Sequence, residues 1–130
     1  MKTFLIDIFW VGLGGFVGSI ARYSMGAFIG LFVSGHFPIG TLLINMLGSL
    51  IFGFVSELSL IGIDVKPELR LLLLSGFCGA FTTFSTFIHE NHQLIKFSEM
   101  PTAMLYTISS IVLGFLALLL GIWLAKTFCG

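Results

Sequence analysis

Four long apolar segments, separated by short polar stretches, run through the chain. They cover approximately residues 4–32, 39–63, 69–95 and 102–126. Each exceeds the roughly 20 residues that a helix needs to cross the hydrocarbon core of a bilayer. Pro38, Pro67 and Pro101 stand just before the last three segments, where a missing backbone N–H is tolerated. The pattern predicts an all-α membrane protein with four transmembrane helices in a single domain over residues 1–130.

The composition supports a membrane protein over a soluble one. Hydrophobic residues make up 57% of the chain and charged residues only 9%, whereas a soluble domain carries about 25% charged residues. The formal net charge is zero, so no basic surface indicates a nucleic-acid partner. Cys78 and Cys129 lie far apart and lack metal or redox spacing, and Cys78 is best interpreted as a small buried apolar residue.

Patterns that resemble catalytic sites do not meet the requirements of those sites. His89-Glu90-Asn91-His92 resembles a zinc-binding helix, but its histidines are three residues apart instead of four. The glycines of residues 12–18 resemble a dinucleotide-binding loop, but no βαβ unit surrounds them. No serine stands in a nucleophile elbow. The sequence therefore predicts that the protein is not an enzyme.

Several polar residues lie inside the predicted spans, and they are the first candidates for a functional site. They are Arg22, Asn45, Tyr106, Ser109 and Ser110. Polar and ionisable groups in a bilayer are costly and usually face a bundle interior or water. Hydrogen bonding between helices would explain any one of them. For the whole set, packing alone is the weaker explanation.

The third span contains the stretch GAFTTFSTF, residues 79–87. Gly76, Gly79 and the pair Thr82-Thr83 are unfavourable in a helix interior, which predicts a break near the middle of this span. Irregular backbone at membrane depth survives only where it is buried in protein or lines a cavity. A broken helix also exposes carbonyl oxygens, which are ligands for hard cations.

Beyond the predicted break, aromatic rings and hydroxyls lie on one short helical segment. Phe84 and Phe87 are three residues apart and share a face. The edges of their rings carry partial positive charge, and neighbouring hydroxyls and the Asn45 amide donate hydrogen bonds. These neutral groups suit a small anion that accepts hydrogen bonds strongly. They also suit water or a sugar, and the chemistry of the side chains favours the anion only weakly.

Three motifs along the chain resemble those of the bacterial CrcB/Fluc fluoride channels. GAFTTFSTF, preceded by Gly76-Phe77-Cys78, resembles the signature of that family. Gly14-Gly15-x-x-Gly18-x-x-x-Arg22-Tyr23 resembles its first-span motif, and Gly40-Thr41-Leu42-x-x-Asn45-x-x-Gly48 its second-span motif. The motifs occur in the family's order in a four-span chain, and the resemblance extends over the whole chain.

The resemblance implies an antiparallel, dual-topology homodimer with two pores in the bacterial inner membrane, exporting fluoride passively down its electrochemical gradient. Carried over by position, Phe84 and Phe87 would line the fluoride path and Asn45 would supply a pore amide. A polar track would follow, formed by Ser85, Thr86, Tyr106 and Ser110. Backbone carbonyls of Gly79 and Thr82 from both subunits would hold a sodium ion at the dimer axis.

Two assignments within that resemblance stay open. Arg22 would either lie near a pore entrance or stabilise the break. Ser109 is adjacent to Ser110, so either serine of the fourth span is a candidate for the polar track.

The charges in the connecting segments bear on how the chain is oriented. Lys2, Lys66, Arg70 and Lys126 are expected on one side of the membrane and only Lys96 clearly on the other. The positive-inside rule then favours a cytoplasmic N-terminus. An antiparallel homodimer needs both orientations, so a heterodimer with an oppositely biased partner is an alternative to the homodimer.

A functional alternative is a proton-coupled exporter of organic cations of the small multidrug-resistance type. Such proteins are also small four-span dimers, but they are expected to carry a carboxylate inside the first span. Here only Asp7, near the end of that span, is available. A membrane protein whose polar residues only pack helices together is a further alternative.

Overall fold

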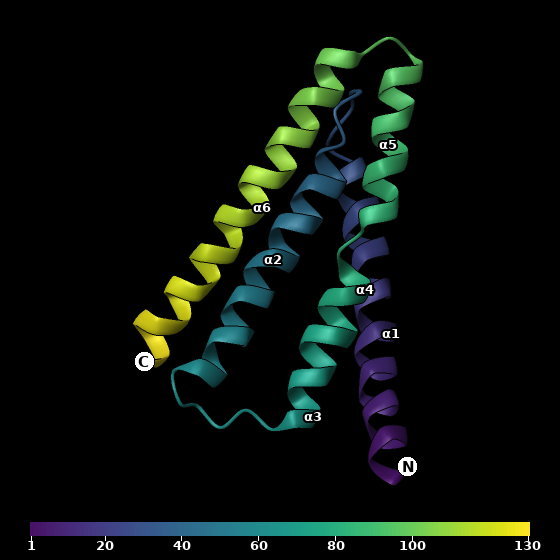
Figure 1. Ribbon diagram of the computed structural model, residues 1–130. Coiled ribbons are helices and arrows are strands. Elements are labelled where there is room, and N and C mark those ends of the chain that lie inside the picture. The colour runs from purple at the N-terminus through teal and green to yellow at the C-terminus, as the bar shows by residue number, and fades with distance from the viewer.

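The computed structural model describes residues 1–130 except for the side chain of Lys2, so the Lys2 charge counted above lies outside the described residues. Within the described part, four helical segments are long and apolar enough to cross a membrane: Thr3–Gly30, Ile39–Leu60, Pro67–Lys96 and Met100–Cys129. They run alternately up and down, and the two termini lie at the same end of the bundle (Figure 1). The protein is thus an all-helical, multi-pass membrane protein.

The first, second and fourth spans are single helices, whereas the third consists of several pieces. The single helices are α1 (Lys2–Gly30), α2 (Ile39–Leu60) and α6 (Met100–Cys129). The third span consists of α3 (Pro67–Arg70), η1 (Leu71–Cys78), α4 (Gly79–Phe81) and α5 (Phe84–Lys96). Pro67 and Pro101 lie in the first turns of α3 and α6, where their missing N–H groups have no helical partner to lose.

The first half of the third span packs directly against the backbone of α1. Segment η1 is π-helical, with wider turns than an α-helix. A side-chain carbon added at Gly14 or Gly18 of α1 would collide with backbone carbonyls of η1. Gly76 of η1 faces α1 with equally little room. The small residues therefore allow the two helical backbones to touch, as is common between membrane helices.

Helices α2 and α6 form the second close contact, and they lie side by side along much of their length (Figure 1). A side-chain carbon at Gly53 of α2 would meet the Leu118 carbonyl of α6. Conversely, a carbon at Gly121 of α6 would meet the Leu50 carbonyl of α2. Here too, glycines bring two backbones into contact.

The remaining apolar surface is divided between a small core and a broad outer face. Leu42, Leu94, Ala103 and Tyr106 form a buried cluster near the end of the bundle where α5 joins α6. Most large apolar residues of α1 and α6 are exposed instead. A helix that is apolar around its circumference is either buried in a large protein or in contact with lipid. In this chain the exposed faces of α1 and α6 suit a bilayer.

Candidate functional site

Between α4 and α5 the third span is not helical. Thr82 (φ −74°, ψ 158°) and Thr83 (φ −145°, ψ 121°) are extended, and Figure 1 shows them as the thin connection between the two helices. The Thr83 hydroxyl accepts a hydrogen bond from the backbone N–H of Thr86 (3.3 Å), which caps the first turn of α5. The two threonines thus end one helix and begin the next within the third span.

Side chains from α1 and α2 hold this extended pair. Asn45 donates from Nδ2 to the Thr83 carbonyl (3.2 Å), and its Oδ1 accepts from the Thr83 N–H (2.8 Å). Arg22 donates from Nε to the Ala80 carbonyl (3.0 Å), one residue before the end of α4. Thr82 packs its methyl group against Gly48, where a larger residue would collide with it. The structure therefore places Arg22 beside the interruption.

A cavity of about 310 Å³ lies next to the extended pair. Its lining residues are Asn45, Ser49, Thr82, Thr83, Phe84, Phe87, Ser110 and Ile111. The structure thus brings together Asn45, Phe84, Phe87 and Ser110, four of the seven residues proposed from the sequence for a fluoride path. No lysine or arginine belongs to this lining, as far as the described side chains show.

The two serines of the fourth span differ in their surroundings. The Ser110 hydroxyl is buried and has no hydrogen-bond partner among the described residues. Ser109 donates its hydroxyl to the Leu105 carbonyl of its own helix (2.6 Å). Ser110 is therefore the serine at the cavity, and its hydroxyl is the one left unpaired within the described part of the chain. A buried polar group without a partner costs about 1–3 kcal/mol, so a partner outside the chain would stabilise it.

The two phenylalanines lie in different environments. Their ring centroids are 6.1 Å apart and the rings are inclined by 36°. Phe87 packs against Tyr106 at 5.1 Å and belongs to the edge of the buried cluster. Phe84 is 76% exposed on the single chain. One wall of the cavity is therefore open in the monomer.

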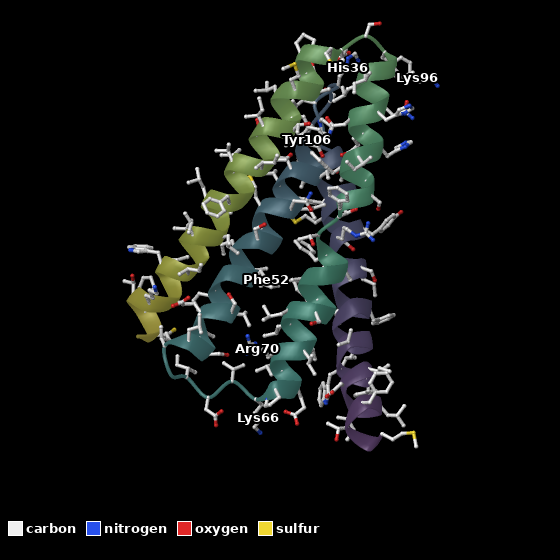
Figure 2. All side chains as sticks on the ribbon, in the orientation of Figure 1. His36, Phe52, Lys66, Arg70, Lys96 and Tyr106 are labelled. Carbon is white, nitrogen blue, oxygen red and sulfur yellow. The ribbon has the colours of Figure 1, made fainter. Side chains whose placement is uncertain are left out.

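A carboxylate that the sequence did not single out as a site residue lies beyond Phe87. Glu90 of α5 accepts hydrogen bonds from the Tyr106 hydroxyl (2.7 Å) and from the Thr41 hydroxyl (2.8 Å). Tyr106 is fully buried, and Figure 2 shows it towards the end of the bundle where His36 and Lys96 lie. Thr41 and Glu90 were missed, although Glu90 follows Phe87 by three residues and so shares its helical face.

Apart from Ser110, the members of the predicted polar track, Ser85, Thr86 and Tyr106, are not among the residues that line the cavity. Ser85 is exposed and is not among its lining residues. The Thr86 hydroxyl accepts a hydrogen bond from the Thr83 hydroxyl (3.0 Å) and so belongs to the capping of α5. A larger cavity of about 610 Å³ opens beyond Glu90 and is lined by the segment 35–38 and by the end of α5.

The predicted cation ligands are backbone atoms of the same region. Gly79 is exposed on the single chain, and Thr82 is half-buried. The described residues contain no group of three or more histidine, cysteine, aspartate or glutamate side chains that could hold a metal ion. Carbonyl oxygens are typical ligands of hard cations.

The fold and the site define a class of protein: a small helical membrane protein whose interrupted third span borders a neutral, polar and aromatic cavity. Residues 9–122 match the family model described as "CrcB-like protein, Camphor Resistance (CrcB)". The chain belongs to the CrcB family.

Relatives from several bacteria match nearly the whole chain. A protein of Chlorobium phaeobacteroides (strain BS1) named "Fluoride-specific ion channel FluC" is 47% identical over 116 residues, 89% of this chain and 90% of the relative. One of Chlorobium chlorochromatii with the same name is 43% identical over 123 residues, 95% of each chain. "Fluoride-specific ion channel FluC 1" of Moorella thermoacetica is 40% identical over 117 residues, 90% of this chain and 84% of the relative.

Proposed function

We propose that this protein is a fluoride-selective channel that lets cytoplasmic fluoride leave down its electrochemical gradient. The observation that carries the proposal is the cavity that joins Asn45, Phe84, Phe87 and Ser110 beside the interrupted span. Membership of the CrcB family and the names of the relatives support the same function.

The cavity offers a dehydrated fluoride ion neutral groups in place of water. The Ser110 hydroxyl is unpaired among the described residues. Asn45 has a second N–H on Nδ2, since an amide nitrogen carries two donors and one is used by Thr83. Phe84 and Phe87 add the positive edges of their rings. These contacts replace part of the hydration shell and carry no full charge, so the ion can leave again.

The ion needs no energy source to cross such a pore in the outward direction. A negative membrane potential drives an anion out of the cell by about 2.3 kcal/mol per charge per 100 mV. Fluoride that enters as its neutral acid ionises inside and is then subject to this force. The result would be resistance to fluoride in the medium.

The exposed side of the cavity supports a second copy of the chain as partner. Phe84 and Gly79 are exposed on one chain although both belong to the candidate site. A phenylalanine on a fluoride path must be shielded from lipid, so we propose that an antiparallel copy covers this face and that the dimer holds two pores. The predicted break would then bring the extended backbones of both copies together.

The same backbone fits a sodium ion at the dimer axis. The extended conformation of Thr82 turns its carbonyl out of the helical hydrogen-bond pattern. Together with the Gly79 carbonyl, two copies would offer four neutral oxygen ligands, which suit a hard cation. A bound sodium ion would supply positive charge that offsets these carbonyl dipoles and links the subunits.

The organic-cation exporter is the weaker proposal. In α1 the acidic residue is Asp7, near the end of the span. Glu90 lies in α5 with its carboxylate bonded to Tyr106 and Thr41. Neither residue supplies the carboxylate within the first span that such an exporter would use.

Release of anions from liposomes tests the proposal. The purified protein would be reconstituted, and efflux of fluoride and of chloride would be compared with ion-selective electrodes. We expect rapid fluoride release without chloride release. Equal release of both ions would contradict selectivity, and no release of either, together with proton-driven uptake of an organic cation, would favour the exporter. Because a single purified chain is used, rapid release would also argue against a required heterodimer partner.

A further inference from the structure

The backbone amide of Thr83 does not bond to the carbonyl that a continuous helix would offer it. In an α-helix each N–H donates to the carbonyl four residues earlier, which here is that of Gly79. The Thr83 N–H instead donates to Asn45 Oδ1 at 2.8 Å. Among the described residues, no other donor is bonded to the Gly79 carbonyl. A side chain of α2 has therefore taken the partner of one predicted cation ligand.

The same substitution of partners occurs three residues later. A continuous helix would direct the N–H of Thr86 to the Thr82 carbonyl. That N–H donates instead to the Thr83 hydroxyl at 3.3 Å, and the extended backbone turns the Thr82 carbonyl elsewhere. The second predicted ligand has thus also lost its helical donor to a side-chain oxygen.

The carbonyls of Ala80 and Thr83, in contrast, each accept a hydrogen bond from a side chain. The Ala80 carbonyl accepts a hydrogen bond from Arg22 Nε at 3.0 Å, and the Thr83 carbonyl accepts one from Asn45 Nδ2 at 3.2 Å. Side chains therefore donate hydrogen bonds to the carbonyls of Ala80 and Thr83. Other side-chain oxygens accept from the two N–H groups that a continuous helix would direct to the carbonyls of Gly79 and Thr82. This pattern separates the carbonyls that are satisfied within the chain from those left for an external ligand.

We propose that Asn45 and Thr83 are positioning residues for the cation site, in addition to any role of Asn45 towards fluoride. Their oxygens take the amides of Thr83 and Thr86, and this leaves the carbonyls of Gly79 and Thr82 able to bind a sodium ion. The inference rests on the sodium site of the proposed function. It assigns to Asn45 an effect on sodium affinity that a fluoride ligand alone would not have.

Sodium-dependent melting of the purified full-length protein tests the proposal without relying on transport. The melting temperature would be measured while sodium chloride replaces N-methylglucamine chloride at constant ionic strength. A ligand that binds only the folded dimer raises the melting temperature by mass action. For Asn45→Leu we expect the sodium concentration at half-maximal stabilisation to rise about tenfold, as for the loss of one well-made hydrogen bond next to the ligand.

A matched control separates this effect from general weakening of the bundle. Asn91 is also a span asparagine with two hydrogen bonds, from Nδ2 to the Phe87 carbonyl (3.0 Å) and at Oδ1 from the Thr107 hydroxyl (2.9 Å). Asn91→Leu should lower the melting temperature but leave the sodium midpoint unchanged. Thr83→Val keeps the β-branched shape that suits an extended residue and removes the capping oxygen. We expect it to raise the midpoint about threefold, which tests the proposal even if Asn45→Leu does not fold.

Two results would overturn the proposal, and they differ in what they say about function. A wild-type sodium midpoint in both Asn45→Leu and Thr83→Val would reject the positioning role while the sodium site stands. A wild-type protein that sodium does not stabilise would reject the cation site and this inference together. Fluoride-selective release from liposomes would then still support the channel.

Discussion

The contact between α2 and α6 is built from glycines, whereas the interruption of the third span is built from hydrogen bonds. Gly53 and Gly121 bring two intact helices together so closely that no side chain fits between them. At the interruption, Asn45 and Arg22 compensate backbone groups that have left their helices. Within lipid every backbone polar group needs a partner, and the two regions meet this requirement in different ways.

We call the α2–α6 contact around Gly53 and Gly121 the frame, and the interruption with the side chains that bond to it the site. In the frame, a wrong side chain separates two helices and should affect the whole fold. In the site, a substitution should leave the helices in place and change the binding or the passage of the ion. Substitutions in the two regions are therefore expected to change different measurements.

The largest effect on the fold is expected at Gly53. In Gly53→Val the new side chain would collide with the Leu118 backbone and force α2 and α6 apart. We expect a loss of about 3 kcal/mol in the free energy of unfolding, seen as a lower melting temperature and loss of the monodisperse species in size-exclusion chromatography. Gly12→Val is the matched control, because a side-chain carbon there would meet no described atom within 4 Å. Equal melting of both variants would refute the close α2–α6 contact.

Phe84→Leu should give the reverse result, with intact folding and lost conduction. Leucine keeps an apolar side chain of similar size on the face that the second copy would cover, so stability should change little. We expect fluoride flux in liposomes to fall about 100-fold, equivalent to about 2.7 kcal/mol in the barrier, because leucine has no positive ring edge. Phe115→Leu, at an exposed phenylalanine of α6, is the control and should conduct normally. Full conduction by Phe84→Leu would exclude this ring from the path.

Ser110→Ala should change stability and fluoride flux in opposite directions. The hydroxyl is buried without a partner among the described residues, so its removal should raise stability by up to about 1 kcal/mol. Flux should fall about fivefold if the hydroxyl donates to fluoride. Ser109→Ala should leave flux unchanged, since Ser109 bonds to its own helix. A Ser110→Ala protein that is less stable and conducts normally would make Ser110 part of the frame.

The four spans could be predicted from the sequence, because long apolar runs are a local property of the chain, but the glycine contacts between α2 and α6 were not predicted. The structure confirms four helices long enough to span a membrane. The π-helical turns of η1 were not predicted, since they depend on packing against α1. The part that the predicted break would play at a dimer axis stays a prediction.

The site was predictable only as a set of candidate residues. Residue types and the family resemblance made Asn45, Phe84, Phe87 and Ser110 candidates, but the shared cavity depends on how each helix is rotated. The hydrogen-bond partners of individual side chains were even harder to predict. The sequence left two roles open for Arg22, and it did not indicate that Glu90 accepts a hydrogen bond from Tyr106. Such pairs join different helices, and hydrophobic periodicity within one helix does not contain that information.

The smallest change in stability is expected for the ion pair between α2 and α6. There Lys126 Nζ lies 3.4 Å from Glu57 Oε1. Glu57 is buried, but the lysine side chain is 59% exposed and stays largely hydrated. An exposed ion pair contributes about 0–1 kcal/mol, and the burial of Glu57 puts Lys126→Met at the upper end of that range.

A double substitution shows which part of this loss belongs to the pair itself. Lys126→Met leaves a buried carboxylate without its partner, whereas Glu57→Gln with Lys126→Met removes both charges. The double variant should therefore melt closer to the wild type than the single variant does. Fluoride flux should be unchanged in both, because the pair lies in the α2–α6 contact and not at the interruption. A selective loss of flux in either variant would show that frame and site are coupled through α2, on which both Glu57 and Asn45 lie.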